Sequence, residues 1–358
     1  MNKWLELLFL KQIKGLGTIT INRKYRVPLN TVSGLDECVK LVREISPQIS
    51  IKELDRARRE AEKRHQFVSG RKDIQVMTIF DDDYHDGFRS MGDKRPPIIY
   101  AKGNVEALQD ESVAIVGTRK PSEWSAIVEK NLVKKMLEQK DPVIVSGLAL
   151  GCDTIAHEMA LQERARTIAV LPCGFEVATP IENRPLAERI VSHGGCLISE
   201  YEPYDLATKY TFVERDAIIA AQSDAVIAIE CGLRSGTMHT MEAAYDMKID
   251  IGCYYPDDMS KGRYEGNAYL IENLYAMKIS DTDDLIKFLK EGSEKNPMDK
   301  LVETNIGKIP VRDYLEIQAS KYGFDSYEDL HKAGYRIQGY ENVFKPIEQK
   351  TNKHELLR

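Results

Sequence analysis

The sequence predicts an α/β protein built on an extended, Rossmann-like, doubly wound and mostly parallel sheet. From Ser112 onward, short apolar runs alternate with Gly-, Ser- or Pro-containing turns and with helical segments. The runs are continuously apolar, as expected of strands buried on both faces of a parallel sheet that helices cover. Six runs are expected as strands: Val113–Val116, Val143–Val145, Thr167–Leu171, Cys196–Ile198, Ala225–Ile229 and Asp250–Tyr255.

Three segments are expected along the 358 residues of the chain. Residues 1–70 form a small module of short helices that continue to about Arg64. Residues 71–290 form the sheet domain, in which residues 71–111 are a connector packed on the sheet, with two short strands expected between Ile74 and Asn104. Residues 291–358 comprise a linker and a small C-terminal helical element, with helices expected at 311–322 and 326–333.

The first module contains a Gly-Leu-Gly turn at residues 15–17. Such a turn between helices can lie against a nucleic-acid backbone, as in helix-hairpin-helix modules, because glycine lets phosphate approach the amides. It can equally be a tight inter-helix turn. The sequence favours the second interpretation, since the neighbouring lysines and arginines are ordinary surface residues.

Charge excludes a globally basic nucleic-acid coat, because the chain has a net charge of -6. The charge is unevenly distributed: residues 1–70 carry 14 Lys and Arg against 8 Asp and Glu, so a basic front precedes an acidic body. Any nucleic acid would therefore be held by a local patch.

The six cysteines form no CxxC pair and no Cys/His cluster, so neither a metal site nor a disulfide framework is expected. The opening residues, Met1 to Leu10, include Glu6 and lack a small-residue cleavage site, and no long uncharged apolar run follows. We therefore expect a cytoplasmic protein without a membrane partner.

Function is expected at the edge where the parallel strands end, because the loops there form a common crevice. Three loops at this edge are rich in small residues: 117–122, 146–153 and 234–237. Glycine lets a ligand approach the backbone, helix-start amides attract anions, and Arg119 and Lys120 add positive charge. Each loop alone is equally consistent with a steric need for glycine, but the three together favour phosphate binding. None contains a dinucleotide fingerprint or a Walker motif, so no cofactor is expected.

Other polar residues at this edge have open interpretations. Asp153 is expected to cap the helix after Gly151, with His157 as a buried hydrogen-bonding histidine. Glu200 and Glu230 follow strands, and either could bind a ribose or base or pair with Arg215.

The order of these motifs resembles the DprA/Smf family of single-stranded-DNA-binding recombination mediators. The family commonly has Gly-Ser-Arg where this chain has Gly117-Thr118-Arg119. The resemblance covers about residues 1–256 and includes these segments: Trp4–Arg26, Pro96–Asn104, Val113–Arg119, Ser146–Ala149, Gly151, Asp153, Ala156–His157, Ala169–Leu171, Gly174, Pro180, Asn183, Ser199–Glu200, Phe212, Arg215, Ile218–Ala220 and Ser235–Thr237.

The resemblance implies an N-terminal SAM-like module and a homodimer that binds single-stranded DNA in a positively charged pocket. It also implies that the protein helps to load a RecA-type recombinase onto incoming DNA during natural transformation, without catalysing a covalent reaction. Combined with the loop reasoning, the expected DNA- or phosphate-binding residues are Gly117, Thr118, Arg119, Lys120, Ser146, Gly147, Leu148, Gly151, Arg215, Ser235, Gly236 and Thr237.

The chain departs from the family pattern at several positions. Arg215-Asp216-Ala217 replaces Arg-Asn-Arg, so the crevice loses a cation and gains an acid. Thr179 replaces a tyrosine before Pro180, and residues 253–256 replace Val-Pro-Gly. The last hundred residues do not resemble the winged-helix domain found in many members.

Two other functions are therefore kept as alternatives. A nucleotide-binding sensor or a phosphoribohydrolase-like enzyme uses a related sheet with a Gly-Gly-x-Gly-Thr-x-x-Glu loop; here Glu242 follows Thr237 by five residues rather than three. The second alternative is a diverged family member that serves as a protein-interaction module in phage defence or toxin neutralisation.

Overall fold

The computed structural model describes residues 3–274 and 276–292, and beyond them Ser320, Asp329 and four short strands. The chain divides into two units, Met1–Ser293 and Glu294–Arg358. In the second unit, β10 (Leu301–Thr304) pairs antiparallel with β11 (Gly307–Pro310), and β12 (Tyr335–Gln338) pairs antiparallel with β13 (Asn342–Pro346). The helices expected at 311–322 and 326–333 fall outside the described residues except at Ser320 and Asp329.

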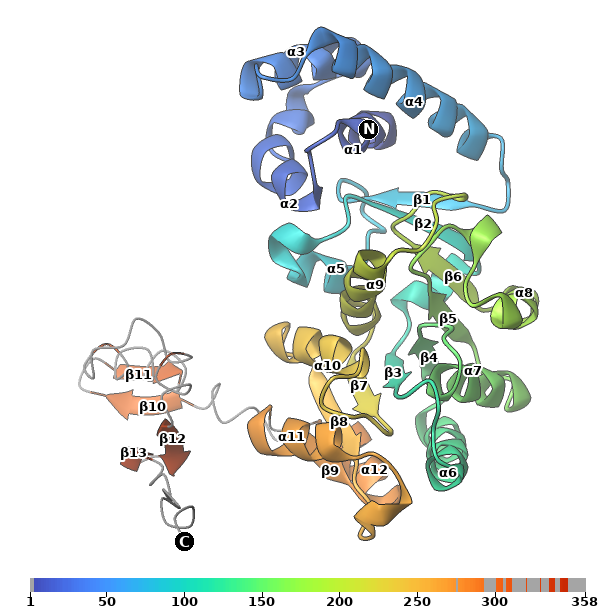
Figure 1. Cartoon of the computed structure of the whole chain (residues 1–358), viewed down its shortest axis with the longest axis vertical. Helices are drawn as coiled ribbons and strands as arrows, with labels where there is room; N and C mark the ends of the chain where they lie inside the picture. The colour runs from blue at the N-terminus through green and yellow to red at the C-terminus, as the bar shows by residue number, and fades with distance from the viewer. Residues whose placement is uncertain are drawn as a thin grey trace, which may run out of the picture. The chain divides into compact units, whose positions relative to one another are not determined.

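A nine-stranded sheet with the order β1-β2-β6-β5-β4-β3-β7-β8-β9 forms the centre of the first unit (Figure 1). Its strands from β6 to β9 in this order run parallel, whereas β1 and β2 are antiparallel at one edge. The predicted α/β class and the six predicted strands are confirmed. The strands are β1 (Gln75–Thr78), β2 (Ile98–Gly103), β3 (Ser112–Val116), β4 (Val143–Ser146), β5 (Thr167–Val170), β6 (Cys196–Ser199), β7 (Ala225–Ala228), β8 (Asp250–Tyr254) and β9 (Met277–Ile279).

Helices cover both faces of this sheet, as the continuous apolar runs predict. In β3, Val113 and Ile115 join the core under α6, α7 and α12, whereas Ala114 and Val116 join the core under α9 and α10. The helices are α1 (Trp4–Gln12), α2 (Thr18–Thr20), α3 (Leu35–Ile45), α4 (Ile51–Ser69), α5 (Asp86–Ser90), α6 (Glu123–Lys140), α7 (Cys152–Gln162), α8 (Arg184–Ser192), α9 (Lys209–Ala221), α10 (Thr237–Asp246), α11 (Glu265–Asn273) and α12 (Thr282–Glu291).

Several helices begin at side chains that cap them. Ser122 Oγ accepts from the amide of Ser125 at the start of α6. The side chain of Asp281 caps α12, and Thr208 forms a capping box with Thr211 at the start of α9. The first amides of a helix have no hydrogen-bond acceptor within the helix, and these side chains supply one. The capping residues therefore help to fix where α6, α9 and α12 begin.

The N-terminal helices pack against the β1–β2 edge of the sheet (Figure 1). Arg64 of α4 forms an ion pair with Glu202 at 2.7 Å, and Lys11 of α1 donates to the carbonyl of Glu200 at 2.7 Å. Part of the basic charge of this module is therefore used to hold it against the acidic body. The connector expected at 71–111 contributes two strands to the sheet itself.

The Gly-Leu-Gly turn links α1 to α2, and Gly15 adopts a φ of +90° that favours glycine. The amide of Lys14 beside it donates to Glu53 Oε1 at 2.8 Å. Because a carboxylate already occupies this amide, the structure agrees with the inter-helix turn that the sequence favours.

The strand order places a switch point between β3 and β7. After β3 the chain adds β4, β5 and β6 on one side, and then returns to place β7 on the other side of β3. Open α/β sheets bind ligands outside the carboxyl ends of the strands at such a point.

Candidate functional site

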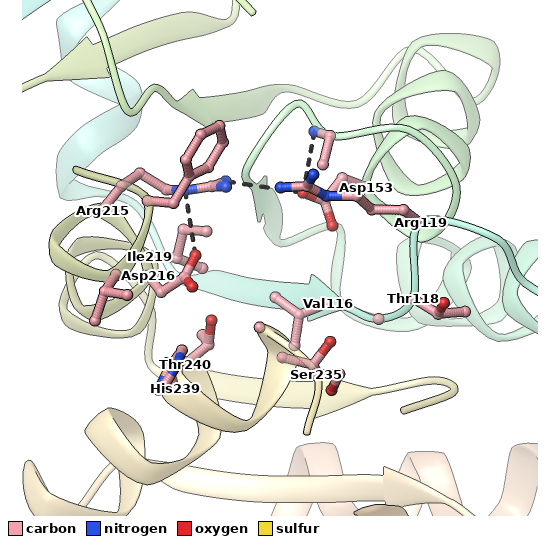
Figure 2. A pocket seen from close by; sticks show the side chains of 16 residues that line it. Val116, Thr118, Arg119, Asp153, Arg215, Asp216, Ile219, Ser235, His239 and Thr240 are labelled. Carbon is pink, nitrogen blue, oxygen red and sulfur yellow. Dashed lines mark hydrogen bonds and ion pairs between the residues drawn. The ribbon is translucent and has the colours of Figure 1, made fainter. Parts of the chain in front are cut away.

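A cavity of about 430 Å³ opens at this switch point (Figure 2). It is called here the principal cavity because both Arg119 and Arg215 line it. Arg119 enters it from the loop after β3, and Arg215 enters it from α9. Its lining residues are Val116, Gly117, Thr118, Arg119, Ala149, Asp153, Phe212, Val213, Arg215, Asp216, Ile219, Ser235, Gly236, Thr237, His239 and Thr240.

Backbone hydrogen bonds hold the loops that follow β3, β4 and β7 together. The amide of Thr118 donates to the carbonyl of Glu230 at 2.8 Å, and the amide of Cys152 donates to the carbonyl of Thr118 at 3.1 Å. Glycine is required here sterically, since a Cβ on Gly117 would lie 2.5 Å from Sγ of Cys152. The three loops that the sequence singled out thus lie side by side.

The loop after β4 is organised around the carboxylate of Asp153. One oxygen, Oδ2, accepts from the amides of Gly147 at 3.2 Å and Ala149 at 3.1 Å. Asn183 supports the loop from behind by donating to the carbonyl of Leu148 at 2.8 Å. The predicted helix cap is wrong in its details, because Gly151 occupies the N-cap position and Asp153 lies inside α7, where it holds the preceding loop.

His157 is fully buried, as predicted, and its Nδ1 lies 2.7 Å from Oγ1 of Thr167. Burial, with a smaller contribution from the charge of Arg215, lowers the pKa of its imidazole to about 3. The histidine is therefore neutral near pH 7 and has a structural position below the cavity.

Arg215 lies between two carboxylates. Its Nε is 3.2 Å from Oδ1 of Asp216, and its Nη1 is 3.8 Å from Oδ2 of Asp153. The Arg215 side chain is only 5% exposed. Burial raises the pKa of Asp216 to about 6, although the charge of Arg215 opposes this rise.

The pairing considered for Arg215 with Glu200 or Glu230 does not occur. The carboxylate of Glu230 accepts from the amides of Ser122 at 2.9 Å and Arg263 at 3.0 Å. Glu200, which follows β6, is buried beside the N-terminal helices, where Lys11 of α1 donates to its backbone carbonyl.

Arg119 is exposed, and its guanidinium lies over the ring of Phe212 with 5.2 Å from Cζ to the ring centroid. Arg215 contacts the same ring, with 5.8 Å from Cζ to the centroid. Phe212 therefore positions both arginines by cation–π contacts. Within residues 3–274 and 276–292, Arg119 takes part in no ion pair, so its charge is available to a ligand.

The structure divides the predicted site residues into two groups. Gly117, Thr118, Arg119, Arg215, Ser235, Gly236 and Thr237 line the principal cavity, and Lys120 lines a neighbouring one. Ser146, Gly147, Leu148 and Gly151 line neither cavity and instead shape the loop that carries Ala149.

Sequence reasoning placed Ala149 in a candidate loop and Asp216 in the crevice, but it assigned no role in the site to Phe212, His239 or Thr240. Phe212 precedes Arg215 by three residues, a spacing that places both side chains on one face of a helix. This spacing was the available signal for Phe212. The contact between α9 and α10, which brings His239 near Asp216, has no equivalent signal in the sequence.

No helix in the described part of the chain combines the length and apolar character needed to cross a membrane. Among the same residues, no group of three or more His, Cys, Asp or Glu side chains is placed to hold a metal ion. All six cysteines are buried as free thiols.

The fold and the cavity define a Rossmann-like α/β protein with a cavity at the switch point of its sheet. Residues 75–290, more than half of the chain, match the family of DNA recombination-mediator protein A. The chain is 34% identical over 212 residues to the DNA processing protein DprA of Streptococcus pneumoniae, a match that covers 59% of this chain and 73% of that protein. The chain therefore belongs to the DNA recombination-mediator protein A family.

Other relatives agree with this assignment. Protein Smf of Borreliella burgdorferi is 32% identical over 203 residues, which cover 54% of this chain and 60% of that protein. The crystal structure of DNA processing protein A from Streptococcus pneumoniae matches with a TM-score of 0.67 at 28% identity, and covers 80% of this chain and 97% of that one. DNA processing protein A from Helicobacter pylori, described for its mode of binding single-stranded DNA, matches with a TM-score of 0.53 at 30% identity and covers 61% and 97%.

Proposed function

We propose that this DNA-processing protein binds single-stranded DNA through the principal cavity. The observation that carries the proposal is the exposed guanidinium of Arg119, which is held over Phe212 and has no ion-pair partner in the described part of the chain. A positive charge beside an aromatic ring suits a phosphate followed by a base. Family membership and the single-stranded DNA binding of the Helicobacter pylori relative support this function.

Each part of the cavity has a role in the proposal. Arg119 binds a phosphate by charge-assisted hydrogen bonds, and Gly117 lets the strand approach the backbone. The segment from Ser235 to Thr237, where α10 begins, offers hydroxyl groups and backbone to a second phosphate. Arg215 keeps Phe212 and the Asp153 loop in position rather than binding DNA directly.

Loading of a RecA-type recombinase, a homodimeric state and the absence of a covalent reaction complete the proposal. The family's description as a recombination mediator supports the role in recombination. In this proposal the carboxylates of Asp153 and Asp216 position Arg215 by ion pairs. Their presence in the cavity therefore requires no acid–base catalysis.

A small nucleotide is the second candidate ligand, and the observation that favours it is Asp216. A carboxylate in a cavity accepts hydrogen bonds from ribose hydroxyls or base amino groups. The phosphoribohydrolase alternative has less support, because Glu242 is exposed and does not line the cavity.

Titration of labelled oligo-dT at several salt concentrations tests the proposal with wild type and Arg119→Ala. Binding should weaken as salt rises, and the variant should bind more weakly, with a salt slope smaller by roughly 0.7 for one lost phosphate contact. Lys287→Ala is the control for lost charge, since Lys287 is exposed on α12 and lines neither cavity. Absent or salt-insensitive binding, together with a nucleotide detected by mass spectrometry in the purified protein, would favour the second candidate.

A further inference from the structure

A second cavity, of about 600 Å³, adjoins the principal one. The loops after β3, β7 and β8 form it, and it shares only Thr118 and Arg119 with the principal cavity. Its lining residues are Thr118, Arg119, Lys120, Ser122, Glu230, Ser260, Lys261, Gly262 and Arg263.

Four cationic side chains surround the second cavity: Arg119, Lys120, Lys261 and Arg263. All four are exposed, and none takes part in an ion pair with any residue that the structure describes. Two of them come from the β3 loop and two from the β8 loop, so the cluster exists only in the folded sheet. Such a concentration of unpaired positive charge around a hollow attracts an anion.

Glu230 is the single acid among the lining residues, and it is 3% exposed. Its two oxygens accept from the amides of Ser122 at 2.9 Å and Arg263 at 3.0 Å. The carboxylate therefore ties the β3 loop to the β8 loop and fixes the distance between their cations. Two other acids close by in sequence, Glu123 and Asp258, do not line the cavity. Oδ1 of Asp258 accepts a hydrogen bond from the amide of Ser260 at 3.0 Å.

Lys261 is held at the rim of the second cavity by an aromatic contact. Its Nζ lies 3.9 Å from the ring centroid of Trp124, and the Trp124 Nε1 donates to the hydroxyl of Tyr254 at 2.9 Å. Trp124 is 40% exposed, so its ring also faces solvent beside the cavity. An aromatic ring near cations is the combination on which single-stranded nucleic acids stack.

We propose that the second cavity is a phosphate subsite for the continuation of the same single strand. The inference rests on the proposed function of the principal cavity. Because the two cavities share Arg119, a strand with one phosphate at Arg119 reaches both. The next phosphates then lie between Lys120, Lys261 and Arg263, where backbone contacts hold the strand without reading its sequence. The β8 loop that supplies two of these cations follows the segment 253–256, at which the chain departs from the family's Val-Pro-Gly pattern.

The test compares short and long oligo-dT, of about 4 and about 20 nucleotides, because single-strand sites span roughly 4–16 nucleotides. Lys261→Ala combined with Arg263→Ala should weaken binding of the long oligonucleotide about tenfold or more at low salt. It should also reduce the salt slope by roughly 1.4, as expected for two lost contacts to single-stranded phosphates. The short oligonucleotide, held at Arg119, should bind this variant as it binds wild type.

Lys287→Ala with Lys290→Ala is the matched control, since it removes the same charge from exposed positions on α12 that line neither cavity. Equal losses in the two double variants would overturn the subsite, because the effect would then be one of net charge. Unchanged binding of the long oligonucleotide to the Lys261/Arg263 variant, with weaker binding to Arg119→Ala, would overturn the subsite alone. Wild-type protein that binds neither oligonucleotide would overturn both the subsite and the proposed function.

Tryptophan fluorescence gives a second readout. The chain has two tryptophans, and Trp4 is buried in the N-terminal module. The long oligonucleotide should change the emission of Trp124, because binding withdraws Lys261 from its ring, whereas the short one should not. Trp124→Phe should abolish the change. A long oligonucleotide that binds tightly without altering Trp124 emission contradicts the subsite.

Discussion

The guanidinium of Arg215 is held by the carboxylate of Asp216, its neighbour in sequence, with 3.2 Å from Nε to Oδ1. Asp153 contacts the same guanidinium from α7. The four charged side chains of Arg119, Arg215, Asp153 and Asp216 therefore cancel within the principal cavity. Arg119 is left as the accessible cation, so we expect single-stranded DNA binding to be modest and sensitive to salt.

Replacing Asp216 by asparagine should strengthen DNA binding. The substitution keeps the shape of the side chain and removes a negative charge from the cavity wall, which is worth about 1 kcal/mol, or roughly fivefold in affinity. Fluorescence anisotropy with labelled oligo-dT at constant salt measures the effect. Asp246→Asn, at an exposed position on the neighbouring helix α10 and outside both cavities, is the charge-matched control. Weaker binding by Asp216→Asn would show that the carboxylate contacts the ligand directly, as expected of a nucleotide site.

Acidic pH should strengthen DNA binding through the same residue. Burial raises the pKa of Asp216 to about 6, so lowering the pH from 8 to 5 protonates the carboxylate and removes its repulsion of phosphate. The titration is made in a His239→Gln background, because this imidazole also faces the cavity. Binding should rise as the pH falls through about 6, and adding Asp216→Asn should flatten the profile. Identical profiles with and without Asp216→Asn would contradict this assignment.

Alanine at Gly147 should destabilise the fold strongly. Its Cβ would lie 1.3 Å from Nη1 of Arg215 and 2.8 Å from Oδ2 of Asp153, so the buried ion pair must separate. Breaking a buried pair costs about 3–5 kcal/mol. Gly232→Ala is the control, since a Cβ there meets no atom within 4 Å and should change the free energy of unfolding by less than about 0.5 kcal/mol. Urea denaturation of the two variants measures the difference, and similar stabilities would show that Arg215 moves freely.

Glutamine at Glu200 should change how stability depends on pH. Burial raises the pKa of this carboxyl from 4.5 to about 7, although Lys11 opposes the rise. The folded state therefore favours the protonated carboxyl. Its contribution to the free energy of unfolding is fully present below the unfolded-state pKa of about 4.5, and it is lost as the pH rises through the folded-state pKa of about 7. Glutamine carries no such charge, so the variant should gain up to about 3 kcal/mol relative to wild type between pH 5 and 8.

Denaturant unfolding at several pH values measures this difference for wild type and Glu200→Gln. Glu188→Gln, at an exposed position on α8, is the control, and its free energy of unfolding should depend on pH as that of wild type does. A constant difference between Glu200→Gln and wild type across this range would mean that the carboxyl is already ionised in the folded protein at pH 5.

The strands were predictable because burial on both faces leaves a local signature. Each of the six predicted runs agrees with a strand of the structure to within two residues at either end. The sheet edge was less predictable: the sequence predicts two short strands within the connector, but not that residues 75–78 and 98–103 join the main sheet as β1 and β2. The antiparallel pairing of β2 with β6 depends on strands about a hundred residues apart, and no local pattern encodes that pairing.

The sequence by itself determined the α/β class, the glycine loops and Arg119 as the leading candidate, because periodicity and turn chemistry are local properties of the chain. Only the tertiary structure decided which arginine is available. Arg119 and Arg215 are both arginines in segments that match the family, but the fold brings Asp153 of α7 to Arg215, beside its own neighbour Asp216, and brings no carboxylate into an ion pair with Arg119 among the described residues. Charge pairing acts through distances in space, so the same residue type is a buried, paired side chain on α9 and an exposed, unpaired one in the loop after β3.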